Sequence, residues 1–181
     1  MSSVTEASRR AWLGLGGNLG DVRYSMIEVL DWLDQRDRIA VNTVSSLYET
    51  PPWGITDQPV FLNACAELVT SLAPPELLSA CLEGERMMKR VRNERWGPRT
   101  IDLDILAMEG VELQTPELVI PHPRVSERAF VLMPLCDLAP LLELNGKSAA
   151  SWRTLRHHRR QEDCQCRGVV ATGKPRMKKP A

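Results

Sequence analysis

The chain has 181 residues, of which 43% are hydrophobic and 25% charged, and its formal net charge is zero. These values are ordinary for a soluble globular protein, and no apolar run approaches the roughly 18 residues that a membrane span needs. The charges are distributed unevenly along the chain. Residues 151–181 hold nine Lys or Arg and two Asp or Glu, which leaves 14 basic and 21 acidic residues in the first 150. We expect one folded domain over residues 1–150 and a basic, flexible tail over 151–181.

The ends of the chain and its cysteines bear on where the protein resides. The segment MSSVTEASRR (1–10) carries no apolar core after its charges, so we expect no secretory signal. Three of the five cysteines lie in apolar-patterned segments, which is typical of small core residues: Cys65, Cys81 and Cys136. We therefore expect a reducing, cytoplasmic setting without a disulfide framework.

Hydrophobic periodicity predicts the main elements in chain order. Alternation and short apolar runs predict strands at 11–16, 39–48, 62–68 and 101–108, and 3.6-residue spacing predicts helices at 22–33 and 74–91. Asn18 or Asp21 is available to cap the first helix, and Glu109-Gly110 is typical of a tight turn. The order strand, helix, strand, strand, helix, strand predicts an α+β fold, with a mostly antiparallel sheet and helices packed on it.

Two carboxylates stand two residues apart inside the apolar segment RWGPRTIDLDIL (95–106). On a strand, residues i and i+2 point to the same side about 6.7 Å apart, so Asp102 and Asp104 share one face. Leu103 and Ile105 then face the core. Two such carboxylates repel each other unless a cation lies between them, and Mg²⁺ commonly takes one or two protein carboxylates together with substrate phosphates. The alternative is a half-exposed strand with a solvated face.

Four arginines precede these aspartates within a dozen residues: Arg90, Arg92, Arg95 and Arg99. Gly97-Pro98 breaks the preceding helix, so the arginines span its end and a loop. Guanidinium groups are planar donors that suit phosphate, and a closing loop that carries them beside a metal site would suit a polyphosphate substrate. The alternative is ion pairing between Arg99 and the aspartates.

Glycine motifs narrow the ways in which phosphates could be bound. The segment GLGGNLG (14–20) lacks the third glycine of G-x-G-x-x-G, which argues against a dinucleotide site. The chain also has no G-x-x-x-x-G-K-[ST], so a P-loop is excluded. Any phosphate chemistry must therefore depend on side chains and metal.

Several single residues allow both a structural and a functional interpretation. Glu85 interrupts an apolar helix stripe, either as a side chain that reaches water or as a hydrogen-bond partner of a ligand. His122 lies between two prolines, and it is either structural or, with Arg124 and Arg128 nearby, a phosphate contact.

The few aromatic residues pose the same choice. Phe61 and Phe130 are core residues or stacking platforms, in a chain with two Phe and two Tyr. Asn63 offers an amide that could read the edge of a heterocycle.

Three segments together resemble the 6-hydroxymethyl-7,8-dihydropterin pyrophosphokinase family of the folate pathway. They are YETPPWGITDQPVFLNA (48–64), RWGPRTIDLDIL (95–106) and IPHPRVSERAFVLMPL (120–135), in the family's order, and the resemblance runs from about Trp12 to Pro140. It implies a ferredoxin-like α+β fold with a βαββαβ core. It also implies transfer of the β,γ-diphosphate of ATP to the pterin hydroxymethyl group, with release of AMP and help from two Mg²⁺ ions.

The resemblance implies a role for each matching residue. The catalytic positions are Arg90, Arg99, Asp102 and Asp104, and the two aspartates are also the metal ligands. The pterin-side positions are Thr50, Pro51, Trp53, Phe61, Asn63, Trp96 and Phe130. The ATP-side positions are Glu85, Arg92, Arg95, Ile105, His122 and Arg128. Two positions depart from the family's pattern: Asn93 stands where a lysine can stand, and Leu82 where a glutamine can contact the nucleotide.

Two rival classes and a metal alternative stay open at this point. A generic metal-dependent kinase or nucleotidyl transferase has a similar D-x-D, and a ferredoxin-like module could bind RNA through the basic tail. The scarcity of aromatic residues argues against base stacking, so we expect no nucleic-acid partner. Zinc binding by His157, His158, Cys164 and Cys166 is not expected, since their spacing fits no common site. We expect a monomer that binds ATP and the pterin and that does not associate with a membrane.

Overall fold

The computed structural model describes residues 7–52, 57–88 and 100–157. The elements of the first two thirds are β1 (Arg9–Gly17), α1 (Val22–Asp34), β2 (Ile39–Val44), β3 (Tyr48–Thr50), β4 (Phe61–Thr70), α2 (Pro74–Met87) and β5 (Asp102–Met108). The predicted order of strands and helices is confirmed. The single strand expected over 39–48 is two strands, β2 and β3, which both pair with β4.

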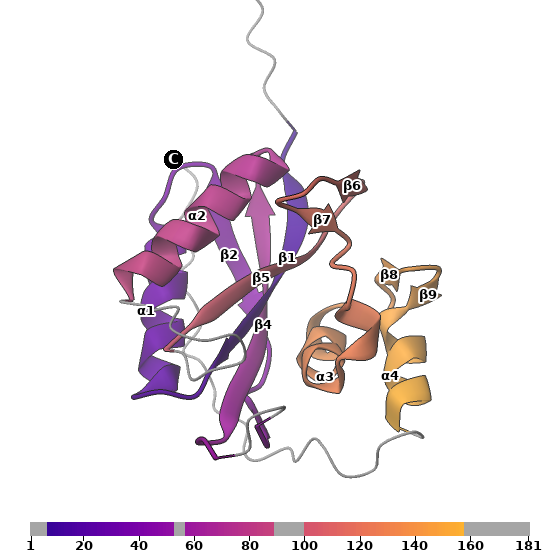
Figure 1. Cartoon of the computed structure of the whole chain (residues 1–181). Coiled ribbons are helices and arrows are strands. Elements are labelled where there is room, and N and C mark those ends of the chain that lie inside the picture. Colours follow the sequence, from indigo (N-terminus) through magenta and orange to yellow (C-terminus); the bar gives the residue numbers. More distant parts are fainter. Residues whose placement is uncertain (1–6, 53–56, 89–99, 158–181) are drawn as a thin grey trace, which may run out of the picture.

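The sheet is antiparallel and has the strand order β2-β4-β1-β5. β3 pairs with the first residues of β4 and β2 with the last, on the same edge of β4. The predicted α+β class is therefore confirmed. Figure 1 shows α1 and α2 together on one side of the sheet and α3 on the other. β5 is an edge strand, so one side of its backbone is open to partners other than a strand.

Each face of the sheet has its own core. Leu13, Leu15, Leu103 and Ile105 pack with α1 and α2 in the larger cluster. The opposite face packs with α3 (Ala129–Leu138) and α4 (Ala149–His157) in a smaller cluster. The expectation that the helices pack on the sheet is confirmed, and the second layer of helices comes from a region where no helix was predicted.

Local sequence explains how α1 begins and how closely it approaches α2. Asp21 is the N-cap, and its Oδ1 accepts a hydrogen bond of 3.0 Å from the Tyr24 backbone N–H. Of the two predicted capping candidates, Asp21 is thus the one that caps. A Cβ on Gly84 of α2 would lie 2.8 Å from Val29 of α1, so only glycine permits this helix contact.

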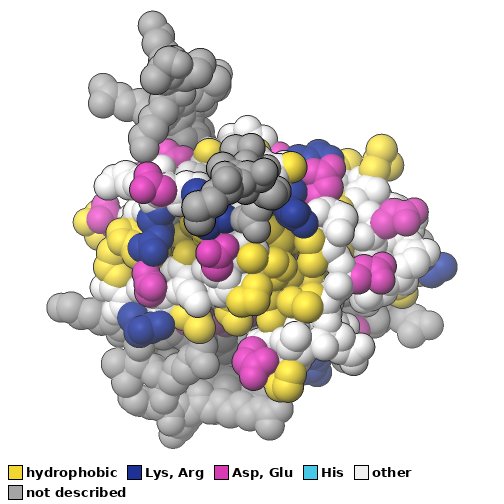
Figure 2. Space-filling view, turned by 90° about the horizontal axis from the view of Figure 1, so that it is seen from above, with side chains coloured by type: hydrophobic (Ala, Val, Ile, Leu, Met, Phe, Trp, Pro, Cys, Tyr) yellow, Lys and Arg dark blue, Asp and Glu magenta, His cyan; other side chains and the backbone are white. Residues whose placement is uncertain are grey.

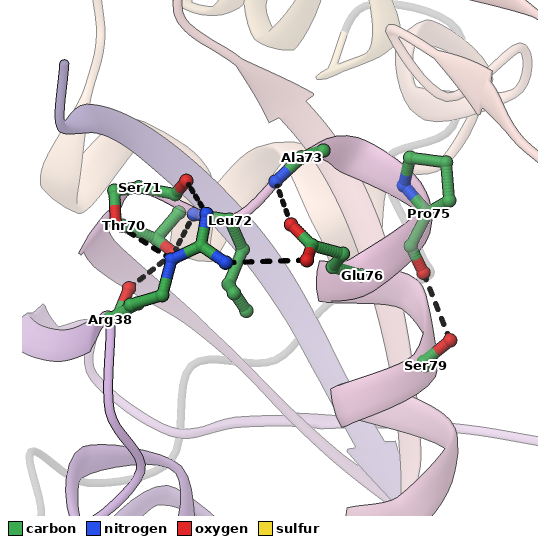
Figure 3. Close-up of polar contacts among 8 residues, drawn as sticks. All are labelled: Arg38, Thr70, Ser71, Leu72, Ala73, Pro75, Glu76 and Ser79. Carbon is green, nitrogen blue, oxygen red and sulfur yellow. Dashed lines mark hydrogen bonds and ion pairs between the residues drawn. The ribbon is translucent and has the colours of Figure 1, made fainter. Parts of the chain in front are cut away.

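The start of α2 is fixed by a cluster of polar contacts (Figure 3). Glu76 accepts a hydrogen bond of 2.8 Å from the Ala73 backbone N–H, and it also pairs with Arg38 at 3.2 Å. Arg38 in turn donates to the side chain and the carbonyl of Ser71, at 3.1 and 2.6 Å. These contacts join the α1–β2 turn to the β4–α2 turn.

Figure 2 views the molecule from above Figure 1, toward the end of the sheet where β1 begins and β4 ends. Hydrophobic side chains lie there among both acidic and basic ones. Arg9 of β1 pairs with Thr70 of β4 at this end, whereas Gly17 pairs with Leu62 at the other. The predicted functional residues of β4 and β5 lie at the other end.

The C-terminal third adds two small hairpins and two helices. They are β6 (Leu113–Gln114) with β7 (Val119–Ile120), the 3-10 turn η1 (Val125–Glu127), α3, β8 (Glu143–Leu144) with β9 (Lys147–Ser148), and α4. Trp152 of α4 packs against the smaller core, and its indole N–H donates to the Leu144 carbonyl at 2.7 Å. The domain boundary predicted at residue 150 falls inside α4, which extends to His157.

One further expectation is met by the described residues. Cys65, Cys81 and Cys136 are buried and free, as predicted for core thiols. No helix in the described part of the chain has both the length and the apolar character needed to cross a bilayer.

Candidate functional site

Strand register brings residues of three strands into one row at the end of the sheet. Gly16 of β1 pairs with Asn63 of β4 on one side and with Asp102 of β5 on the other. Gly14 likewise lies between Cys65 and Asp104 in the next row. Directly paired residues of antiparallel strands project to the same face, so both rows point to the α3 side. We call these two rows the sheet floor.

Glycine gives the centre of the floor its shape. Neighbouring strands lie about 4.8 Å apart, so the backbones at Asn63 and Asp102 are about 10 Å apart with no side chain between them. A Cβ on Gly16 would approach the Asn63 Oδ1 atom to 3.2 Å. The floor therefore leaves room for a flat group between an amide and a carboxylate.

Asn63 is held in one orientation by its neighbour on β3. Its side chain is 6% exposed, and its Nδ2 donates to the Thr50 hydroxyl at 2.9 Å. The Oδ1 atom lies on the Gly16 side, because it is the atom that a Gly16 Cβ would meet. Asn63 thus turns a fixed acceptor toward the floor. Pro51 follows Thr50 directly and is exposed.

Asp102 and Asp104 are both half-buried on this face, as the strand periodicity predicted. Asp104 Oδ2 lies 3.7 Å from Arg128 Nη1, in a pair whose two side chains are partly exposed. Such a pair is worth little energy, about 1 kcal/mol or less. The ion pairing predicted for Arg99 lies outside the described residues, whereas Arg128 is a pairing partner that sequence reasoning did not assign to this carboxylate.

The two carboxylates suit a hard cation that is completed by other ligands. In the described part of the chain, no three His, Cys, Asp or Glu side chains gather as a ready metal site. Asp102 and Asp104 supply oxygen donors from adjacent same-face positions, which is the donor set that Mg²⁺ takes when substrate phosphates and waters fill the rest. The residues present therefore fit magnesium that binds together with a phosphate substrate.

Glu85 of α2 supports β5 from its open edge. Its side chain is 4% exposed, and its Oε1 accepts a hydrogen bond of 2.9 Å from the Leu103 backbone N–H. Of the two alternatives for Glu85, a side chain that reaches water is ruled out, because its carboxylate satisfies a buried edge donor between Asp102 and Asp104. Contact with a nucleotide stays a prediction for this residue.

His122 is anchored beside β5 by backbone contacts. Its N–H donates to the Leu106 carbonyl at 2.8 Å, and its Nδ1 accepts from the Arg124 backbone N–H at 3.1 Å. Burial, together with the positive charges of Arg128 and Arg124, lowers the pKa of His122 to about 4. The ring is therefore neutral at pH 7, and since Nδ1 accepts, Nε2 carries the proton and can donate it in a hydrogen bond.

Aromatic side chains stand at two sides of the floor. Phe61 pairs with Thr50 and precedes Asn63 by two residues on β4, so it lies on the same face, and it is half-buried. Phe130 lies in the first turn of α3, with the Arg128 guanidinium carbon 5.8 Å from its ring centroid. Both rings are half-buried, and Phe130 also packs against the smaller core, so each keeps an exposed part that a flat ligand could cover.

Some of the predicted residues contribute no described side chain to the floor. Six of them lie outside the described residues: Trp53, Arg90, Arg92, Arg95, Trp96 and Arg99. Ile105 is 3% exposed in the larger core, so its side chain does not reach the floor. Its backbone lies two residues beyond Leu103 and shares that residue's orientation toward the edge of β5.

Sequence reasoning missed three features of the site. Gly14 and Gly16 were considered only as part of a failed dinucleotide motif, although their spacing of two within a strand puts both on one face. Asn18 was considered as a helix cap, but its Nδ2 donates to Gln58 Oε1 and to the Pro59 carbonyl, both at 3.0 Å. Asp137 of α3 was not considered, although it is the only charged residue of that helix.

The fold and the floor define an α+β protein with a paired-carboxylate site next to a fixed amide. A family model described as 7,8-dihydro-6-hydroxymethylpterin-pyrophosphokinase (HPPK) matches residues 12–140. A Methylorubrum extorquens protein named 2-amino-4-hydroxy-6-hydroxymethyldihydropteridine pyrophosphokinase is 48% identical over 139 residues, 77% of this chain and 88% of that protein. A Bacillus subtilis protein of the same name is 43% identical, over 77% of this chain and 83% of that protein. This chain belongs to the HPPK family.

Solved structures agree on the fold. The crystal structure of wild-type Plasmodium falciparum HPPK-DHPS with pteroate aligns with a TM-score of 0.68 at 17% identity, covering 87% of this chain. The chain spans 44% of that longer protein. At this identity the likeness is evidence for the fold alone.

Proposed function

We propose that this protein transfers the β,γ-diphosphate of ATP to the hydroxymethyl group of 6-hydroxymethyl-7,8-dihydropterin and releases AMP. The observation that carries the proposal is the floor, where the register of β1, β4 and β5 puts Asn63 and the Asp102–Asp104 pair on one face. Membership in the family supports the choice of substrates.

The pterin ring would lie above Gly16, between Phe61 and Phe130. Asn63 Oδ1 is oriented by the Thr50 hydroxyl and would accept from donors on the ring edge. Backbone groups at Thr50 and Pro51 are next to this position, and Trp53 and Trp96 are predicted to contribute from residues outside the described part. The hydroxymethyl group would then point toward Asp102 across the floor.

The triphosphate would lie beside β5. Arg128 is already 3.7 Å from Asp104 and offers a guanidinium group to phosphate oxygens, and neutral His122 offers Nε2–H. Arg90, Arg92, Arg95 and Arg99 are predicted to add positive charge from the loop, and Ile105 a backbone contact. Two Mg²⁺ ions, held by Asp102 and Asp104, would neutralise phosphate charge and ease deprotonation of the hydroxyl. The chain's own part is to align the hydroxyl with the β-phosphorus and to stabilise the charge that develops.

We further infer a ferredoxin-like arrangement. If β2 and β3 count as one strand, the four strands have the spatial order 4-1-3-2 and all pairs are antiparallel. The predicted cytoplasmic location and monomeric state stay predictions.

Identifying the nucleotide product tests the function. The purified full-length protein is mixed with ATP, Mg²⁺ and 6-hydroxymethyl-7,8-dihydropterin, and the products are separated by chromatography. We expect AMP and the pterin diphosphate in equal amounts. Production of ADP would instead indicate a kinase, and release of pyrophosphate would indicate a nucleotidyl transferase. Omission of the pterin is the control, because AMP should then not form.

A further inference from the structure

Asp137 joins α3 to β3 and to the segment before it through both of its carboxylate oxygens. Oδ1 accepts a hydrogen bond of 2.8 Å from the Tyr48 hydroxyl, and Oδ2 accepts one of 3.1 Å from the Ser46 backbone N–H. Tyr48 is 7% exposed, so its hydroxyl needs a partner inside the protein. Hydrogen bonds that a carboxylate accepts are stronger than hydrogen bonds between neutral groups, and two of them to one side chain fix its direction as well as its distance.

The sheet end of this contact belongs to the site. Tyr48 pairs with Asn63 in the register of β3 and β4, so it stands in the same row as Asn63, Gly16 and Asp102. Thr50, which orients the Asn63 amide, is two residues further along β3. Movement of β3 would therefore move the acceptor that the floor presents.

The segment before β3 is held firmly to β4. The Ser45 N–H donates to the Cys65 carbonyl, and the Cys65 N–H donates to the Ser45 hydroxyl, both at 2.8 Å. Residues 45–50 and the floor are thus one unit to which Asp137 attaches.

The helix end of this contact carries an aromatic wall of the site. Phe130 precedes Asp137 by seven residues, which is close to two helical turns, so both project from the same side of α3 about 10 Å apart along its axis. Val131, Leu135 and Cys136 hold α3 against the sheet by apolar packing, which does not fix direction. The bonds of Asp137 are directional, and together with the Arg128–Asp104 pair at the start of α3 they place Phe130 along the sheet.

We propose that Asp137 and Tyr48 form a positioning clasp that sets the spacing between Phe130 and the Asn63 row, and thereby the affinity for the flat pterin ring. Neither residue touches the reacting atoms. The inference rests on the proposed function, because it assigns the space between Phe130 and the floor to the pterin. Loss of the clasp should weaken pterin binding more than nucleotide binding, because Arg128 stays paired with Asp104 on β5.

Binding measurements on the full-length protein test the clasp. We would compare Tyr48→Phe, Asp137→Asn, Asp137→Ala and the double variant Tyr48→Phe/Asp137→Ala with the unaltered protein. Calorimetry would measure the Kd of 6-hydroxymethylpterin with a nonhydrolysable ATP analogue present, and the Kd of that analogue alone. Asp31→Ala, which removes an exposed carboxylate on α1, is the matched control.

We expect the pterin Kd to rise about tenfold in Asp137→Ala and about threefold in Tyr48→Phe, while the Kd of the ATP analogue changes less than twofold. The double variant should equal Asp137→Ala, because both changes remove the same bond. Asp137→Asn should fall between, since its amide keeps one acceptor oxygen. In steady state the KM for pterin should rise more than kcat falls.

Three results would overturn the clasp. They are an unchanged pterin Kd in folded Asp137→Ala, an equal rise in the Kd of both ligands, and additive effects in the double variant. A lower melting temperature without a change in pterin Kd would show that the bonds only stabilise the fold. These results differ from failure of the proposed function, in which the unaltered protein itself forms no AMP and binds no pterin.

Discussion

The two faces of the sheet consist of alternating residues of the same strands, yet they differ in what they carry. On the face toward α1 and α2, Leu13, Leu15 and Ile105 fill the space between sheet and helices. On the opposite face at the same strand ends, Gly16 leaves the floor bare between an amide and a carboxylate, whereas the Leu106 side chain lies against Gly14.

This comparison shows how one sheet supports both stability and function. Branched side chains on one face bury apolar area and hold the strands in register. The register then fixes the positions of polar groups on the other face, which pack little and are costly for the fold. Changes on the first face should therefore alter stability, and changes on the floor should alter activity.

The largest effect is expected from Asp104→Asn. Removal of one negative charge from the carboxylate pair should lower kcat by about a thousandfold, because the charge balance around the phosphates is lost in the transition state. The Asp104 side chain is half-buried and lies within the regular strand β5, so the melting temperature should change little. Turnover measured under saturating ATP and Mg²⁺ checks this, with Asp31→Asn as the control. Activity near that of the unaltered protein would remove Asp104 from the metal site.

The packed face is tested by Leu13→Ala. Leu13 is fully buried, so the cavity left behind should reduce the free energy of unfolding by about 3 kcal/mol. The kcat of the protein that stays folded should be unchanged. Urea unfolding followed by circular dichroism gives the first quantity. Leu141→Ala, at a side chain that is 82% exposed, should change stability by less than about 0.5 kcal/mol.

Gly16→Ala tests whether the bare floor matters. The added Cβ would lie 3.2 Å from Asn63 Oδ1 and displace the amide, so the KM for pterin should rise about tenfold. In Gly14→Ala the added Cβ meets the flexible Leu106 side chain instead, also at 3.2 Å, and the KM should rise less. Equal effects of the two variants would contradict the role given to Asn63.

The smallest effect concerns His122 and pH. Its pKa is lowered to about 4 in the folded protein, below its ordinary value of 6.5. The unfolded chain therefore takes up a proton between pH 6.5 and 4 while the folded protein does not, so stability falls as the pH falls through this window. After allowance for partial exposure we expect a loss of about 1 kcal/mol.

The difference between the unaltered protein and His122→Gln in urea unfolding at pH 6.5 and pH 4.5 isolates this contribution. Titration of the His122 ring by NMR provides a direct check. A midpoint near pH 6.5 would show that burial and the neighbouring arginines do not act on this ring as described.

Local sequence patterns predict most of the helices and strands, although one of these patterns was not used for prediction. The strands and helices up to Met108 follow from alternation and from 3.6-residue spacing. The β8–β9 hairpin was also foreseeable, because Asn145-Gly146 is a favoured pair for a turn with two positive φ values, which are 50° and 79° here. No hairpin was predicted there, because the apolar periodicity fades from about Asn145.

The candidate site was foreseeable only in part. That Asp102 and Asp104 share a face follows from the two-residue period of a strand, and the sequence alone determined it. The partners across the face were decided by the tertiary structure: Asn63 and Gly16 are separated by 47 positions yet pair directly, and Asp137 reaches Tyr48 across 89. The physical reason is range, since periodicity reports which way a side chain points, whereas register and helix placement depend on contacts between segments that are far apart in the chain.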